Sequence, residues 1–250
     1  MTGVRLKRRE QNTVTIRLPT LLDERTLERS EIVANACMNR ARNHSGANSY
    51  ERDLGLAPLD FLTNVLQRQD EASWLDLCCG AGRALLQAAE ALRSNAQDRR
   101  IMLTGVDLVP MFDPIPPGLG WVHLVSASVE RWETEKKFDL ITCVHGLHYV
   151  GDKLGVLQRA SGWMNEDGLL MMHIDYRNLK IADQGHSRTQ IGRDLRKVGF
   201  RYRSGRHLLT RNDNIHYDPL PYRYLGADDK TGPNYTGQAA VDSYYERIRT

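Results

Sequence analysis

Two carboxylates and a glycine-rich turn between them are the residues best placed to do chemistry. Asp76 lies in the apolar run 74–77, and Gly80 and Gly82 follow it directly. Glycines let a backbone approach a ligand closely, and the Ala/Leu-rich segment after Gly82 would begin a helix whose free N–H groups face the same place. Asp107 ends the next apolar run, 25 residues after Gly82. A carboxylate at that distance is typical of the acid that accepts hydrogen bonds from the two ribose hydroxyls in nucleotide-binding folds.

The charge of Asp76 limits the ligand. A carboxylate beside the turn would repel a pyrophosphate, whereas it suits a ligand with an amine or a sulfonium. Residues 76–82 (DLCCGAG) resemble the first motif of class I S-adenosylmethionine-dependent methyltransferases, acidic-x-Gly-x-Gly-x-Gly. Cys78 departs from the motif where the first glycine usually stands. Because cysteine carries a Cβ, we expect a negative φ at Cys78.

The resemblance implies S-adenosylmethionine as the cofactor, with S-adenosylhomocysteine as its product. It assigns Asp76, Cys78, Gly80 and Gly82 to the glycine-rich turn, Asp107 to the ribose with Leu108 beside it, and His145 to the methyl end. Ser128 would accept from the adenine amine and the Val129 N–H would serve ring N1, although Ser128 as a helix cap is an equal alternative. Tyr50 would reach the cofactor carboxylate or the substrate from an N-terminal helical lid; a surface position at a helix start is the other interpretation.

Candidate catalytic residues follow the later apolar runs. Residues 138–144 resemble the family's fourth motif, whose end faces the transferred methyl, and His145 and His148 come directly after it. Either imidazole is a candidate general base, because imidazole titrates near neutral pH, and a structural histidine is the alternative for both. No carboxylate completes a metal site around them, so we predict none. Asp175, at the end of the run 169–175, is the third catalytic candidate.

Alternating apolar runs and amphipathic segments predict an α/β fold. We expect a Rossmann-like, doubly wound, mostly parallel seven-stranded sheet with an antiparallel last strand and an N-terminal helical lid. The expected division is a lid over 1–70, a methyl-donor-binding core over 71–210 and a Tyr-rich extension over 211–250 that completes the sheet. Within it we expect a helix over 21–42, one strand over 200–210 and the antiparallel strand over 220–225.

The composition is that of an ordinary globular chain. It has 250 residues, of which 41% are hydrophobic and 26% charged, with a formal net charge of +3. This charge is too small to imply a nucleic-acid partner. The sequence has neither a signal peptide nor an apolar run near 18 residues, so we expect no membrane partner and a cytoplasmic location. Its four cysteines lack CxxC spacing, which favours reduced thiols.

The predicted reaction is methyl transfer from S-adenosylmethionine to an O, N or C nucleophile of a small molecule. Tyrosines recur in the tail, and their rings suit a planar aromatic acceptor, a satellite core or a homodimer contact equally well. An RNA or protein methyltransferase, or a non-catalytic S-adenosylmethionine-binding subunit, remains the alternative. A nicotinamide dehydrogenase is disfavoured, because the third glycine of its Gly-x-Gly-x-x-Gly motif would fall on Arg83 or Leu85.

Overall fold

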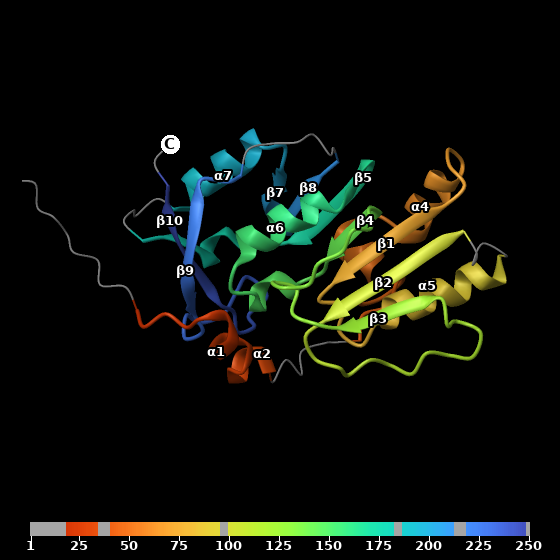
Figure 1. The fold of residues 1–250 in the computed structure, drawn as a ribbon, viewed down its shortest axis with the longest axis horizontal. Helices are drawn as coiled ribbons and strands as arrows, with labels where there is room; N and C mark the ends of the chain where they lie inside the picture. The colour runs from red at the N-terminus through yellow and green to blue at the C-terminus, as the bar shows by residue number, and fades with distance from the viewer. Residues whose placement is uncertain (1–18, 35–40, 96–99, 183–186, 213–218, 249–250) are drawn as a thin grey trace, which may run out of the picture.

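A seven-stranded sheet forms the centre of the computed structural model, which describes residues 19–34, 41–95, 100–182, 187–212 and 219–248 (Figure 1). Its strands lie across the sheet in the order β3 (Val122–Ser126), β2 (Ile101–Asp107), β1 (Ala72–Leu77), β4 (Phe138–Cys143), β5 (Met164–His173), β8 (Leu208–Arg211) and β7 (Arg201–Arg203). The first five strands are parallel, and β8 runs antiparallel to both of its neighbours. The predicted fold class is therefore confirmed.

The edge of the sheet differs from the sequence prediction in one respect. The segment expected to be one strand over 200–210 folds as a hairpin, in which a 3-10 turn, η3 (Ser204–Arg206), joins β7 to β8. The chain reverses at His207, whose φ of 50° lies in the left-handed region. The antiparallel last strand of this sheet is consequently β8, and the assignment of that role to 220–225 was wrong.

Helices cover both faces of the sheet. On one face α4 (Pro58–Leu66) and α5 (Arg83–Ser94) share a hydrophobic core with Trp74 and Leu140. On the other, α6 (Lys153–Gly162) and α7 (Ser187–Lys197) share a second core with Leu75 and Ile141. Successive strand residues point to opposite faces, so a sheet covered on both sides needs strands that are apolar throughout.

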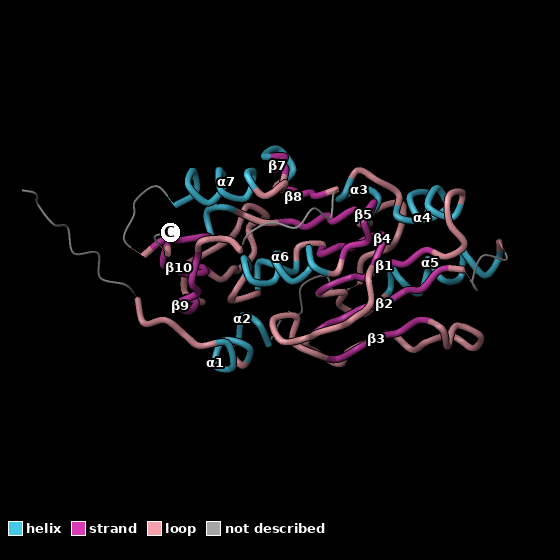
Figure 2. Tube along the Cα trace, turned by 45° about the horizontal axis from the view of Figure 1, so that its top comes forward, coloured by secondary structure: helices cyan, strands magenta, loops and turns pink. Residues whose placement is uncertain are grey.

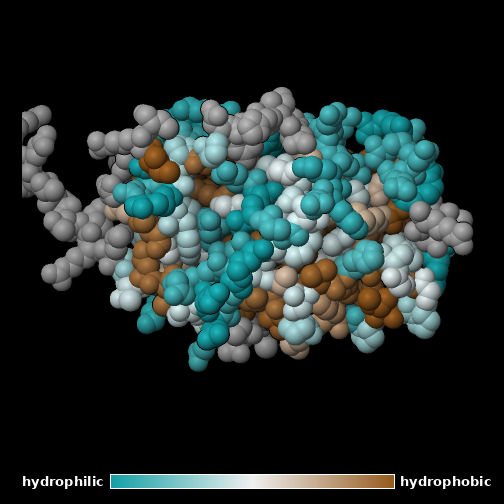
Figure 3. Space-filling view, in the orientation of Figure 1, coloured by the Kyte–Doolittle hydropathy of each residue, from teal (hydrophilic) through white to brown (hydrophobic). Residues whose placement is uncertain are grey.

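Figure 3 shows hydrophobic residues gathered on the surface over the β2–β3 edge.

The C-terminal extension builds a separate sheet. Its order is β6 (Leu179–Ile181), β10 (Asp242–Arg247) and β9 (Tyr222–Asp228), with β10 parallel to β6 and antiparallel to β9. The expected strand over 220–225 thus overlaps β9. The extension does not complete the seven-stranded sheet, however, because its hydrogen bonds go to β6 and to its own second strand.

The N-terminal segment packs against this second sheet. Two short helices, α1 (Glu24–Glu28) and α2 (Glu31–Ala34), replace the single helix expected over 21–42, whose residues 35–40 lie outside the described ranges. They lie beside β9 in both views (Figures 1 and 2). Leu22 exchanges two backbone hydrogen bonds with Ala227, and Leu27 packs in a small core with Val241. No described helix is long and apolar enough to cross a membrane.

A buried lysine ties the second sheet to the main core. Lys153, the first residue of α6, is fully buried, and its Nζ donates to Val150 O, Val241 O and Ser243 Oγ, each at 2.8 Å. Burial lowers the pKa of Lys153 to about 7. Because its ammonium has three donors and all three are used, the side chain joins the start of α6 to the start of β10 with no donor left over.

We predict that Lys153→Met destabilises the protein by about 3 kcal/mol, since it leaves three buried acceptors without a donor. Urea unfolding measures the change, and hydrogen exchange should show β10 opening first. Lys197→Met is the matched control: its side chain is mostly exposed and makes one ion pair with Asp194, which is worth little in water. Equal stability losses in the two variants would contradict the bridging role.

Candidate active site

The turn between β1 and α5 is held in an unusual backbone conformation. Cys78, Gly80 and Gly82 have φ angles of 55°, 62° and 74°. The negative φ expected at Cys78 was therefore wrong: this cysteine adopts the left-handed conformation that ordinarily favours glycine. Such a conformation costs a residue with a Cβ roughly 1–2 kcal/mol, so the surroundings must hold it in place.

Gly146 makes the room for Cys78. A Cβ placed on Gly146 would lie 2.2 Å from the Cβ of Cys78 and 2.7 Å from its Sγ. Cys78 thus places a side chain where the motif has a glycine, and Gly146, which has no side chain, leaves the space that Cys78 fills. Gly105 of β2 is similar, because a Cβ there would lie 2.8 Å from the Sγ of Cys79.

Asp107 joins the end of β2 to this turn. Its Oδ2 accepts from the Gly80 N–H at 2.8 Å and its Oδ1 from the Val109 N–H at 3.0 Å. These two bonds fix the plane of the carboxylate beside the glycine-rich turn, where the ribose role placed it.

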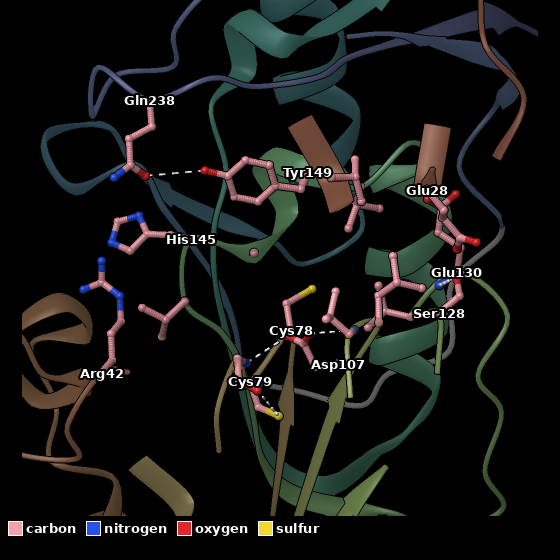
Figure 4. A pocket seen from close by; sticks show the side chains of 18 of the residues that line it. Glu28, Arg42, Cys78, Cys79, Asp107, Ser128, Glu130, His145, Tyr149 and Gln238 are labelled. Atoms are coloured by element: carbon pink, nitrogen blue, oxygen red, sulfur yellow. Dashed lines mark hydrogen bonds between the residues drawn. The ribbon is translucent and has the colours of Figure 1, made fainter. Parts of the chain in front are cut away.

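A pocket of about 950 Å³, part of it open to solvent, lies along the carboxyl ends of β1, β2 and β4. Of the ten residues predicted to bind the cofactor, eight line it: Tyr50, Cys78, Gly80, Asp107, Leu108, Ser128, Val129 and His145. Figure 4 shows Glu28, Ser128 and Glu130 on one side of it, Arg42 and His145 on the other, and Cys78 and Asp107 between them. The spacing of the motifs in the chain thus brings most of the predicted site to one place.

The end of the pocket near Ser128 is closed by α1. Ser128 Oγ donates to Glu24 Oε1 at 3.4 Å and accepts from the Glu130 N–H at 3.2 Å. Arg131 pairs with both Glu24 and Glu28, at 2.8 Å in the second case. The hydroxyl of Ser128 therefore has partners within the protein. Its predicted contact to an adenine amine stays a prediction.

Asp76 does not line the pocket. Its Oδ2 accepts from Tyr50 Oη at 2.7 Å and its Oδ1 from Thr142 Oγ1 at 2.6 Å, while Trp74 Nε1 donates to that hydroxyl at 2.8 Å. Burial raises the pKa of Asp76 to about 7, against the effect of the two hydroxyl donors. The carboxyl group thus fastens α3 (Tyr50–Leu54) to β1 and β4, and the expected direct contact between Asp76 and a ligand amine is not what the geometry offers.

His145 stands at the opposite end of the pocket from Ser128. It has a φ of 61° and begins the 3-10 turn η1 (Gly146–Tyr149). Its Nε2 lies 3.6 Å from Asp53 Oδ2, its Nδ1 lies 3.1 Å from Tyr235 Oη, and its ring stacks on His173 at 4.2 Å. Although burial alone would raise the pKa of Asp53, His145 and the charge of Arg42 hold it below its ordinary value.

The other two catalytic candidates lie away from the pocket lining. Both ring nitrogens of His148 are buried without a hydrogen-bond partner among the described residues, and burial lowers its pKa to about 3. Asp175 caps the 3-10 turn η2 (Tyr176–Asn178) and binds Arg177 through three side-chain hydrogen bonds. A catalytic role for either one stays a prediction that this geometry does not favour.

Gly82 is also absent from the lining; it is the N-cap of α5. Several lining residues escaped sequence reasoning, namely Glu28, Arg42, Glu130, Tyr149 and Gln238. Glu130 could have been found, because it follows Ser128 at the end of β3. No local signal identifies Arg42 or Gln238, which reach the pocket from the two terminal segments. Within the described ranges no group of three or more His, Cys, Asp or Glu could hold a metal ion.

The chain matches a family described as the methyltransferase domain over residues 50–218. It therefore belongs to that family, and with the sheet order given above the predicted class I methyltransferase assignment is confirmed.

Individual relatives are more distant. The (S)-coclaurine N-methyltransferase of Papaver somniferum is 30% identical over 131 residues, which is 50% of this chain and 36% of that protein. The chain thus spans little more than a third of this relative. A solved coclaurine N-methyltransferase bound to N-methylheliamine and SAH is 22% identical, with 53% and 40% of the chains covered and a TM-score of 0.38. The sugar N-methyltransferase KedS8 from Streptoalloteichus sp ATCC 53650 is 18% identical, with 46% of each chain covered and a TM-score of 0.33.

We predict that Gly146→Ala destabilises the protein by roughly 2 kcal/mol, because the new Cβ would overlap Cys78. Cys78→Gly should restore most of the loss when the two changes are combined. Thermal unfolding of wild type, both single variants and the double variant gives the coupling energy. Additive effects would mean that the two residues do not share one space.

A second prediction concerns pH. Since burial raises the folded-state pKa of Asp76 to about 7, the folded protein binds this proton more tightly than the unfolded chain. Its contribution to stability is therefore fully present below about pH 4 and is lost as the pH rises to about 7, by at most roughly 4 kcal/mol. Asp76→Asn should remove this part of the pH dependence. Asp60→Asn, at an exposed position of α4, should leave it unchanged; identical curves for the two variants would contradict the assignment.

Proposed function

We propose that this protein transfers a methyl group from S-adenosylmethionine to a nucleophilic atom of a small molecule. The observation that carries the proposal is the carboxylate of Asp107, fixed by the N–H groups of Gly80 and Val109 on the wall of the pocket. A carboxylate so oriented suits two vicinal ribose hydroxyls. With the ribose at Asp107, the adenine would lie on one side of this residue and the methionine part of the donor on the other.

The residues present fit this donor. Leu108 and Val129 offer apolar walls beside Asp107, where an adenine ring would lie, and Glu28 and Glu130 make that end of the pocket acidic. Cys78 and Gly80 bring the backbone of the turn to the middle of the pocket. Burial raises the pKa of Glu130 although two N–H groups, of Gly151 and Asp152, bind its carboxylate. Carboxylates at this end of the pocket disfavour a ligand that would place phosphate groups there.

The bound donor supplies an already activated methyl group on a sulfonium sulfur. The protein's own contribution is then to position the acceptor in line, to exclude water and to take up a proton where the acceptor releases one. His145 is a side chain on the pocket wall suited to the last task, because a neutral imidazole has one ring nitrogen that can accept a proton. Tyr149 and Gln238, whose side chains meet at 3.4 Å, border the same end and leave room for a small acceptor.

The first test is methyl transfer itself. Purified protein is incubated with methyl-labelled S-adenosylmethionine and a panel of phenols and of primary and secondary amines; amines come first because the curated relative named above is an N-methyltransferase. Labelled product with release of S-adenosylhomocysteine supports the proposal. Binding of the donor without transfer to any acceptor, including RNA and protein extracts, would favour the non-catalytic subunit, whereas label in a macromolecule would favour the RNA or protein enzyme.

We further predict that Asp107→Ala weakens binding of S-adenosylmethionine by about 10- to 100-fold, equivalent to 1–3 kcal/mol for a lost charged hydrogen-bond partner. Equilibrium dialysis with labelled donor measures the effect. Asp113→Ala is the control, because Asp113 pairs with Arg83 outside the pocket. If Asp107→Ala binds as tightly as this control, Asp107 is not a ligand-binding residue.

A further inference from the structure

Tyr235 lies in the C-terminal extension, beyond the part of the chain that matches the methyltransferase domain. Its phenol nevertheless contacts a residue of the pocket wall, because its oxygen lies 3.1 Å from Nδ1 of His145. The turn that carries it, closed by the Asn234 N–H bond to Gln238 O at 2.7 Å, also carries Gln238 on the pocket wall. The extension therefore supplies Gln238 to the pocket wall and a hydrogen-bond partner to His145, in addition to a second sheet.

The rings of two histidines hold Tyr235 in this position. Its ring stacks on His207 at 3.8 Å with an interplanar angle of 5°, and it meets His148 edge-on at 5.3 Å. His207 is fixed in turn: Tyr202 Oη lies 3.0 Å from its Nδ1 and donates to Ile174 O at 3.2 Å. A phenol held from several sides has one defined position beside His145.

The protons along this series can be assigned from the partners. Asp53 is ionised, and its carboxylate beside Nε2 of His145 favours the tautomer with the proton on Nε2. Nδ1 is then an acceptor, so the bond to Tyr235 runs from the phenol O–H to Nδ1. Burial raises the pKa of Tyr235, which keeps that proton on the phenol. The phenol oxygen retains lone pairs for one further partner.

We propose that Asp53, His145 and Tyr235 form a proton relay and that the methyl acceptor gives up its proton to the phenol oxygen of Tyr235. The proposal rests on the methyltransferase function proposed above. As the bond between the methyl carbon and the acceptor forms and the carbon–sulfur bond breaks, the acceptor's proton passes to Tyr235 Oη. The phenol's own proton passes to His145 Nδ1, and the resulting imidazolium faces the Asp53 carboxylate.

This arrangement names the acceptor class. A relay of this kind serves a nucleophile that carries a removable proton, such as a phenol or a primary or secondary amine, and gives no help to a tertiary amine or a thioether. Tyr235 is then the catalytic residue in contact with the acceptor. Asp53 and Arg42, which bind each other, position the imidazole from the lid side.

The variant Tyr235→Phe tests the relay, and Tyr202→Phe is its matched control. Both substitutions remove one hydroxyl bonded to a histidine Nδ1 and keep a stacked ring, but Tyr202 touches His207 and not His145. Nitrogen-15 NMR of the imidazole groups should show His145 protonated on Nε2 in the wild type, with its Nδ1 signal changed by Tyr235→Phe alone. Asp53→Asn should weaken the preference for the Nε2–H tautomer. A wild-type His145 protonated on Nδ1, or an Nδ1 signal unaffected by Tyr235→Phe, would overturn the relay.

Kinetics give the second readout. With any acceptor that the labelled-methyl assay identifies, Tyr235→Phe should lower kcat by roughly 100-fold, the usual scale of general-base catalysis, while KM for S-adenosylmethionine and the affinity for S-adenosylhomocysteine stay within about 2-fold. An unchanged kcat contradicts the relay. If the wild-type protein does not bind S-adenosylhomocysteine at all, the proposed function is contradicted instead, so failure of the relay and failure of the proposed function are distinguishable.

Discussion

The site depends on one backbone constraint, the passage of the chain through three left-handed residues between β1 and α5. With Cys78, Gly80 and Gly82 in this conformation, the Gly80 N–H points at the carboxylate of Asp107 and α5 begins directly behind the turn. The conformation is available only because Gly105 and Gly146 leave space for Cys79 and Cys78. The wall of the pocket is thus determined by packing between three neighbouring strand ends.

Segments from both ends of the chain line the pocket that lies at the carboxyl ends of the core strands. The N-terminal helix α1 reaches it through the pairs of Arg131 with Glu24 and Glu28. The C-terminal extension reaches it through Gln238, and its Tyr235 contacts His145. Both ends meet on the second sheet, where Leu22 pairs with Ala227. Lys153 fastens that sheet to the first turn of α6. Its hydrogen bonds to Val241 and Ser243 therefore stabilise the fold and also hold in place the extension that carries Gln238 of the pocket wall.

The local motif could be predicted because its chemistry is local. A carboxylate after a buried strand and a glycine-rich turn before a helix locate the site in any parallel α/β fold, and Gly80 and Asp107 line the pocket as expected. The conformation of Cys78 could not be predicted, because its compensation, Gly146, lies on another strand end. Asp76 was assigned to the ligand for a similar reason: its true partners, Tyr50 and Thr142, become visible only once helix α3 and β4 are placed.

The tail was the least predictable part. The strand expected over 220–225 overlaps β9 (Tyr222–Asp228), but the sequence of a strand does not say which strand it pairs with. The extension forms a separate sheet because β10 pairs with the short strand β6. The three residues of β6 are too few to give a strand pattern that could be recognised in the sequence. The same applies to Tyr235, one tyrosine among several in the tail. Its contact with His145 follows from the return of the chain across the core.

The most direct measurement is calorimetric titration of the full chain with S-adenosylhomocysteine, and separately with NADH and NADPH. We predict micromolar binding of S-adenosylhomocysteine with a stoichiometry of about one per chain, and no heat of binding from either nicotinamide. No heat of binding with S-adenosylhomocysteine, together with binding of NADH or NADPH, would contradict the proposed methyl donor. The glycine-rich turn, Asp107 and the acidic wall would then have been assigned to the wrong ligand.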